Sequence, residues 1–187
     1  MPSPEELPGN MVAVVSDVPV SRGRITKAEF QHALVLAAGR NSVPKPGGNG
    51  YERLKRDTLD YLLEGVWIVG EAAEMGIVVT RSEVAHELAL IKKQSFKSEA
   101  EYRRFLRESH YTRRDMNERV EVQMLSFRLQ KRLQERIERE ARNKFEEQRA
   151  IREFVTEFNE RWRGRTVCAP EYATERCSNG PLPSGGT

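Results

Sequence analysis

The sequence predicts a mainly α-helical fold, and three observations lead to that prediction. Charged residues make up 32% of the 187 residues and aromatic residues only 7%, a balance typical of long solvated helices. Short polar caps mark helix starts at close intervals between residues 76 and 120. The segments between these caps carry apolar residues at helical spacing. A chain of this length suits one domain, or one domain with a tail.

The first elements of the chain are short. Residues 1–10 are rich in proline and are expected to form a disordered leader. The apolar run 11–15 is expected to be a strand, with which residues 18–20 can pair as a β-hairpin. Thr26 and Glu29 have the spacing of a capping box, in which each side chain bonds the other residue's backbone amide. The first helix should therefore begin after Thr26.

A long central helix follows. Glycine and proline in residues 41–50 predict a loop, and residues 51–75 then have apolar positions on more than one helical face. Such a helix should be surrounded by others and form the centre of the core. Gly65 and Gly70 within it are expected to permit close helix packing, and Gly76 is expected to end it in a left-handed cap.

Three capped helices come next, each with a polar cap residue and an acidic residue three positions later. These pairs are Thr80 with Glu83, Ser98 with Glu101, and Thr112 with Asp115. From Arg113 the helical pattern runs without glycine or proline to Gly164. We expect its charged arm, residues 128–149, to project into solvent or to bend into a hairpin. The apolar face of the C-terminal helix, residues 150–163, should then pack back on the domain.

Three motifs stand out along this stretch: I-T-x-x-x-F, G-I-x-V-T and I-x-K-Q-x-F-x-S-E-x-E-Y-x-x-F-L. The residues that form them are Ile25, Thr26 and Phe30, then Gly76, Ile77, Val79 and Thr80, then Ile91, Lys93, Gln94, Phe96, Ser98, Glu99, Glu101, Tyr102, Phe105 and Leu106. Over roughly residues 11–140 the chain resembles the N-terminal chaperone domain of the SurA and PrsA foldases. The resemblance implies a helical chaperone domain over residues 11–164, with the C-terminal helix packing back on it.

In the resembled foldases a parvulin prolyl isomerase domain precedes the C-terminal helix. Here the matching interval, residues 136–149, is far too short to hold such a domain. We therefore expect that the isomerase is absent and that the protein is not an enzyme. Kinship alone could still lead to its description as a peptidyl-prolyl isomerase.

No residue pattern indicates catalysis or a cofactor. His32, His86 and His110 lack the spacing of metal ligands. The acidic pairs lie in strongly solvated helices, where no burial separates their pKa values for acid and base chemistry. Neither a P-loop nor a dinucleotide-binding motif is present. We expect no catalytic residue, no metal and no cofactor.

Binding of other polypeptides is the remaining role. Methionine and aromatic side chains suit that role, because they can repack around varied partners. In most proteins such residues are core, but a few are expected to face an apolar groove between the second helix and the charged arm. The arm would supply a polar rim. The candidate peptide-binding residues are Trp67, Met75, Tyr102, Phe105, Met116, Met124 and Phe127.

The two cysteines lie in the predicted tail, residues 165–187. Cys168 and Cys177 enclose a short loop, and a disulfide between them would restrict the unfolded tail by about 2.5 to 3 kcal/mol. Two free thiols on a flexible tail are the alternative. The family resemblance favours the disulfide, which indicates an extracytoplasmic location. Residues 1–10 have no signal-peptide pattern. Either the leader is missing from this sequence or the protein stays in the cytoplasm, and the resemblance to exported foldases implies a missing leader.

The predicted function is an ATP-independent extracytoplasmic chaperone that holds unfolded or nascent exported polypeptides. A helical structural module is the alternative, in which the arm pairs with a second copy as a homodimer or with a specific partner. Nucleic-acid binding is disfavoured, because the net charge of +3 arises from interleaved Lys, Arg and Glu. No apolar run has the length of a transmembrane segment.

Overall fold

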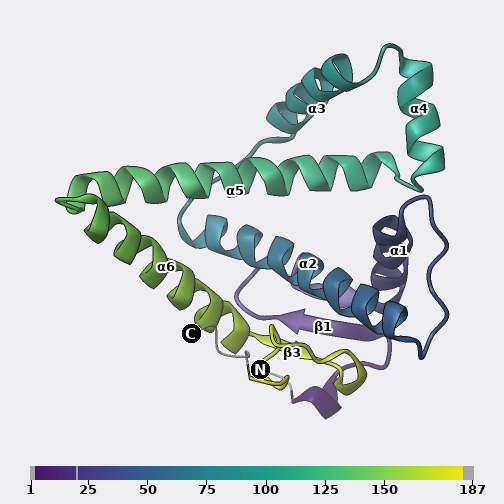
Figure 1. Ribbon diagram of the computed structural model, residues 1–187, viewed down its shortest axis with the longest axis horizontal. Helices are drawn as coiled ribbons and strands as arrows, with labels where there is room; N and C mark the ends of the chain where they lie inside the picture. The colour runs from purple at the N-terminus through teal and green to yellow at the C-terminus, as the bar shows by residue number, and fades with distance from the viewer. Residues whose placement is uncertain (1–2, 20, 183–187) are drawn as a thin grey trace.

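The computed structural model describes residues 3–19 and 21–182, and it is mainly α, as predicted. Within these residues the chain forms six α-helices and one small sheet (Figure 1). The strands are β1 (Met11–Val15), β2 (Arg24–Thr26) and β3 (Thr166–Cys168). The helices are α1 (Lys27–Ala38), α2 (Asn49–Glu74), α3 (Arg81–Ser95), α4 (Glu99–Glu108), α5 (Arg113–Glu140) and α6 (Lys144–Gly164). Short 3-10 turns occupy Pro4–Glu6, within the expected leader, and Pro170–Tyr172.

The predicted hairpin partner of β1 is wrong. The strand that pairs antiparallel with β1 is β2, not residues 18–20. Pro19 has no amide hydrogen to contribute to a strand ladder, and its carbonyl instead accepts hydrogen bonds from the amides of Arg22 and Gly23 in a turn. Val18 and Pro19 therefore lie in the loop between the two strands, and Val20 lies outside the described residues.

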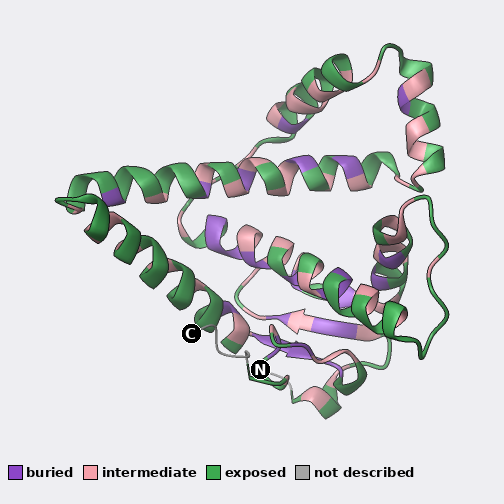
Figure 2. Cartoon of the chain, viewed as in Figure 1, coloured by how far each residue is buried: buried purple, intermediate pink, exposed green. Residues whose placement is uncertain are grey.

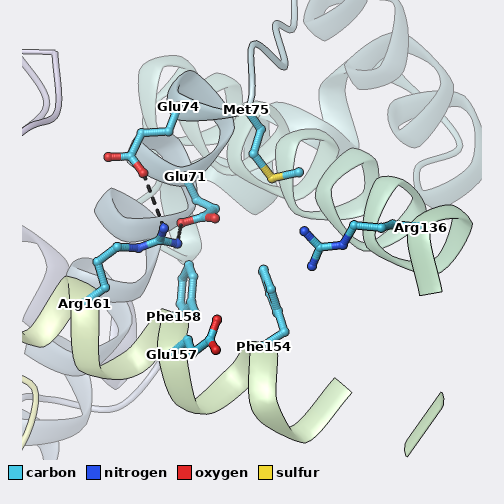
Figure 3. A pocket seen from close by; sticks show the side chains of 8 residues that line it. All are labelled: Glu71, Glu74, Met75, Arg136, Phe154, Glu157, Phe158 and Arg161. Carbon is cyan, nitrogen blue, oxygen red and sulfur yellow. Dashed lines mark hydrogen bonds and ion pairs between the residues drawn. The ribbon is translucent and has the colours of Figure 1, made fainter. Parts of the chain in front are cut away.

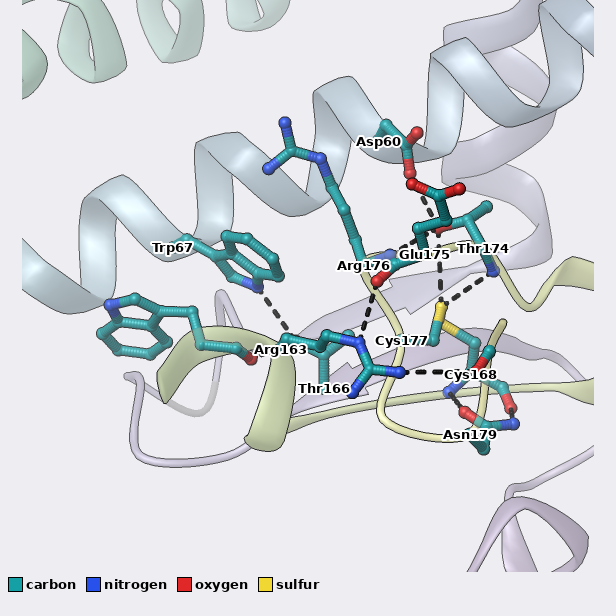
Figure 4. The surroundings of a disulfide bond; sticks show 12 residues. Asp60, Trp67, Arg163, Thr166, Cys168, Thr174, Glu175, Arg176, Cys177 and Asn179 are labelled. Atoms are coloured by element: carbon teal, nitrogen blue, oxygen red, sulfur yellow. Dashed lines mark hydrogen bonds between the residues drawn. A yellow bond between two sulfur atoms is a disulfide. The ribbon is translucent and has the colours of Figure 1, made fainter. Parts of the chain in front are cut away.

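The segment predicted as a tail is part of the sheet. The strand order is β2-β1-β3, so the central strand β1 joins the two ends of the chain, and Ala13 pairs with Cys168. Cys168 and Cys177 form a disulfide, and neither is exposed. The Asn179 side chain bonds the backbone amide and carbonyl of Cys168 at 3.1 and 2.9 Å (Figure 4). These bonds cover the edge of β3 that faces away from β1.

The predicted helix starts are confirmed by their caps. Complete capping boxes form between Thr26 and Glu29, Thr80 and Glu83, and Thr112 and Asp115. Ser98 also caps its helix, but the Glu101 carboxylate accepts from the amide of Lys97 instead. The long helical pattern after Arg113 is interrupted at residues 141–143, where the Asn143 side chain caps α6. The charged arm therefore bends into a helical hairpin.

The main core lies between the sheet, α1, α2 and the C-terminal end of α6 (Figure 2). Its largest fully buried side chains are Trp67, Trp162, Phe30, Leu34, Leu59, Leu63 and Val12. Trp67 Nε1 donates to Thr166 Oγ1 at 2.9 Å, so its polar atom is satisfied in the core. The end of α6 thus packs on the N-terminal part of the domain.

Only one of the two α2 glycines permits close helix packing. A Cβ atom on Gly70 would overlap the ring of Trp162, so α6 approaches α2 where no side chain intervenes. At Gly65 the nearest atom to such a Cβ would be 4.0 Å away, on Val122. The prediction of close packing is therefore wrong for Gly65, because α5 leaves room there.

The long helix α5 spans the molecule and separates two groups of helices (Figure 1). On one side it packs on α2, and α6 returns from its far end at a sharp angle. On the other side it contacts α3, and α4 leads from the far end of α3 back to the start of α5. No helix in the described part of the chain combines the length and hydrophobicity of a membrane span.

Candidate functional site

A cleft of about 290 Å³ opens where the end of α2 faces α5 and α6. This is the place where the sequence predicted a groove, between the second helix and the arm. The residues that line it are Glu71, Glu74 and Met75 from the end of α2, Arg136 from α5, and Phe154, Glu157, Phe158 and Arg161 from α6 (Figure 3). The cleft therefore combines apolar side chains with charges of both signs.

The wall formed by α6 is aromatic. Phe154 and Phe158 are one helical turn apart and stack with ring centroids 6.1 Å apart. Phe158 packs on Trp67 of the core in a T-shaped arrangement with ring centroids 6.1 Å apart, which holds this part of the wall in place. Met75 projects from the opposite side of the cleft (Figure 3). Ile151 and Val155, on the same helix, remain 39% and 48% exposed, so apolar surface continues along α6 beyond the cleft.

One cluster of charges in the cleft is engaged in holding the helices together. Glu71 is only 4% exposed, and its carboxylate accepts from Arg161 at 2.5 Å and from Trp162 Nε1 at 2.7 Å. Arg161 also pairs with Glu74 at 3.7 Å, and Arg165 pairs with the same carboxylate. Because a buried carboxylate needs such partners, this cluster anchors α6 on α2.

Two further charges face the open part of the cleft. The Arg136 guanidinium lies 5.9 Å from the centroid of the Phe154 ring, a cation–π distance. Glu157 lines the same space from α6. In residues 3–19 and 21–182, neither Arg136 nor Glu157 forms an ion pair. These two side chains can therefore meet the polar groups of a ligand.

The seven residues predicted to bind peptides do not form one surface. Met75 lines the cleft, and Met124 and Phe105 are half-buried elsewhere. Phe127 is 67% exposed, on a part of α5 outside the cleft. Trp67, Tyr102 and Met116 are only 1%, 3% and 8% exposed. Trp67 belongs to the core and contributes to the cleft only by supporting Phe158.

The aromatic pair of the cleft was not among the predicted binding residues. Phe154 and Phe158 belong to the apolar face of the C-terminal helix, residues 150–163, which the sequence predicted to pack back on the domain. Only Trp162, at the end of that face, is fully buried. The signal that could have singled out the pair is the strongly charged sequence before it, which leaves few apolar side chains on the arm to bury this face.

Comparison of the sequence with models of known protein families identifies one match. A family model described as the SurA-like N-terminal domain matches residues 8–130, more than half of the chain. The chain belongs to this family. No parvulin domain is matched alongside the SurA-like domain, and neither a curated protein nor a solved structure matches the chain. The matched region includes α2 and most of α5 but ends before Arg136, so the α6 wall of the cleft lies outside it.

Proposed function

We propose that this SurA-like protein is an ATP-independent chaperone that holds unfolded or extended segments of exported polypeptides in the cleft between α2, α5 and α6. The observation that carries the proposal is the aromatic pair Phe154 and Phe158 facing Met75 across an open space, with Arg136 and Glu157 at its sides, neither in an ion pair with another described residue. Membership of the SurA-like family supports a chaperone-like role in general terms.

The chemistry of the cleft suits ligands of varied sequence. Aromatic and methionine side chains bury apolar groups without demanding one shape. Arg136 can bind an anionic or acceptor group of the client, and Glu157 can bind a cationic or donor group. The apolar surface along Ile151 and Val155 can extend the contact. Burial of one large apolar side chain is worth roughly 1.5–3 kcal/mol. Contact with one or two such side chains would give weak binding, which permits release as the client folds.

The proposed location of this activity is extracytoplasmic. The buried disulfide between Cys168 and Cys177 supports it, since structural disulfides persist in oxidising compartments. The proposed partners are unfolded or nascent exported polypeptides, and the proposed action is binding without catalysis. The absence of a matched parvulin domain is consistent with that action.

The experiment that tests the proposal is the aggregation of a chemically unfolded client, followed by light scattering without ATP. We expect suppression near a stoichiometric ratio of the wild-type protein. Phe154→Ala should weaken suppression, because it removes half of the aromatic wall. The matched control is Phe127→Ala, since Phe127 is 67% exposed but lies outside the cleft. If only Phe127→Ala weakened suppression, the cleft would be the wrong site.

A structural role is the second candidate, and the exposed apolar positions of α6 favour it. Ile151 and Val155 could bury against a second copy of the chain or against a specific partner. In that case light scattering would show a dimer whose population rises with protein concentration, and the wild-type protein would not suppress aggregation even in large excess.

A further inference from the structure

We propose a second binding site, which takes a carboxylate group, where α3, α4 and the start of α5 meet. A hollow of about 230 Å³ opens there, and the residues that line it are Leu88 and Lys92 from α3, Glu99 and Tyr102 from α4, and Arg113 and Asn117 from α5. Helices α3 and α4, which form two of its walls, lie on the side of α5 away from α2 and α6 (Figure 1). The inference does not depend on the proposed chaperone function, because the two sites share no residue.

The hydroxyl of Tyr102 is the first observation that points to a ligand. Tyr102 is 3% exposed, and within the described residues its hydroxyl oxygen is buried without a hydrogen-bond partner. Buried polar groups in native proteins are almost always paired. The Tyr102 side chain lines the hollow together with Lys92, Glu99 and Arg113, the charged groups whose fields act on this hydroxyl.

The protonation of Tyr102 makes this hydroxyl a donor. Burial raises the pKa of Tyr102 above its ordinary value, more than the nearby cations lower it. The phenol therefore keeps its proton at neutral pH, and it can donate to an oxygen acceptor that enters the hollow. An anionic oxygen would accept the strongest hydrogen bond from it.

The charges around the hollow select a group with one negative charge. Lys92 Nζ pairs with Glu99 at 2.5 Å and lies 4.5 Å from the Tyr102 ring centroid, so these two charges offset each other. Arg113 has no ion-pair partner in the described part of the chain. Its guanidinium leaves the hollow with one uncompensated positive charge, and it matches the planar, two-oxygen geometry of a carboxylate. A phosphate dianion would leave an excess of negative charge.

The carboxylate could come from a polypeptide C-terminus or from an acidic side chain, and three probes separate these sources. They are acetyl-trialanine with a free C-terminus, the same peptide with a C-terminal amide, and acetyl-Ala-Glu-Ala-amide. Binding is followed by two-dimensional NMR of the full chain at millimolar probe concentrations. We expect saturable shifts of the backbone amides at residues 88–117 with at least one carboxylate probe, and no shifts with the amidated trialanine.

Two variants locate the interaction. Tyr102→Phe should weaken carboxylate binding by about tenfold or more, because it removes a hydrogen bond to a charged acceptor. Its melting temperature should stay unchanged or rise, because it also removes an unpaired buried hydroxyl. Arg113→Gln should weaken binding as well. Arg114→Gln is the matched control, because Arg114 pairs with Glu118 at 2.8 Å and does not line the hollow.

Three results would overturn the inference. The first is that no carboxylate probe shifts the amides of residues 88–117. The second is that Tyr102→Phe binds as tightly as the wild-type protein while remaining folded, which would leave the hydroxyl without a role. The third is that inorganic phosphate binds more tightly than every carboxylate probe, which would contradict the charge argument.

Discussion

The base and the arm of this molecule are built in opposite ways. The base consists of the sheet, α1, α2 and residues 162–182, and it buries Trp67 and Trp162 to 1% exposure or less. Residues 131–158, which include most of the charged arm and the outer part of α6, are mostly exposed (Figure 2). Phe145 and Val155 among them are 70% and 48% exposed. Ile137 is the one large apolar side chain of residues 131–158 that is buried. The contrast indicates that the base supplies stability and the arm supplies the accessible wall of the cleft.

Truncation of the tryptophan that joins the two regions should have the largest effect on stability. Trp162→Ala should lower the free energy of unfolding by roughly 3–5 kcal/mol, because it leaves a cavity beside Gly70 and removes a partner of Glu71. Denaturation in urea measures the change. Phe145→Ala, in the arm of the same helix, should change it by less than about 0.5 kcal/mol. Equal losses in the two variants would contradict the contrast between base and arm.

Removal of the disulfide tests whether the C-terminal segment belongs to the base. Replacement of Cys168 and Cys177 by alanine should lower the free energy of unfolding by about 2.5 to 3 kcal/mol, since the unfolded chain loses a short closed loop. A reducing agent should shift the thermal unfolding of the wild-type protein in the same direction. An unchanged unfolding midpoint in both experiments would show that residues 166–180 contribute little to the folded base.

The two α2 glycines sharpen the contrast within a single helix. Gly70→Ala should destabilise the protein by about 1–3 kcal/mol, because the added methyl group overlaps the Trp162 ring. Gly65→Ala should instead stabilise it by up to about 1 kcal/mol, because alanine is the better helix former and the site has room. Thermal unfolding of both variants checks the opposite signs. Stabilisation by both substitutions would mean that α6 does not pack at Gly70.

The smallest effect concerns a third region, the α3 and α4 lobe, where acid should loosen the junction with α5. The backbone amide of Thr80, together with Arg128, lowers the pKa of Glu83 from 4.5 to about 2. A carboxylate with a lowered pKa stabilises the folded state above pH 4.5, and that contribution fades as the pH falls from 4.5 toward 2. The wild-type protein should therefore lose more protection of α3 from hydrogen exchange between pH 5 and pH 3 than Glu83→Gln does. Identical losses of protection in the two proteins would show that Glu83 does not cause the loosening of this junction in acid.

Local chemistry explains what could be predicted from the sequence. The capping residues Thr26, Thr80 and Thr112 act within three positions of themselves, so their helices could be predicted without knowledge of the rest of the fold. The strand β3 could not, because its three residues are too few for a pattern and its partner is at the other end of the chain. A missed strand led to the prediction of a tail.

The candidate site was harder to predict than the fold. Residue type indicates which side chains can bind varied partners, but it does not indicate which of them remain accessible. Trp67, which was predicted to bind peptides, is therefore buried in the core. Phe158, which was not among the predicted binding residues, lines the cleft. The location of the groove followed from the order of helices, whereas its lining depends on the bend at residues 141–143.

The most direct test of the central claim is photo-crosslinking of an unfolded client from defined positions of α6. A benzophenone side chain at position 154 would lie in the aromatic wall of the cleft, and the same group at position 145 would lie on the exposed part of the arm. We predict that the client is captured from position 154 and only weakly from position 145, and that an excess of unlabelled unfolded client suppresses this capture. Equal capture from both positions, or capture from position 145 alone, would contradict the claim that the cleft holds the client.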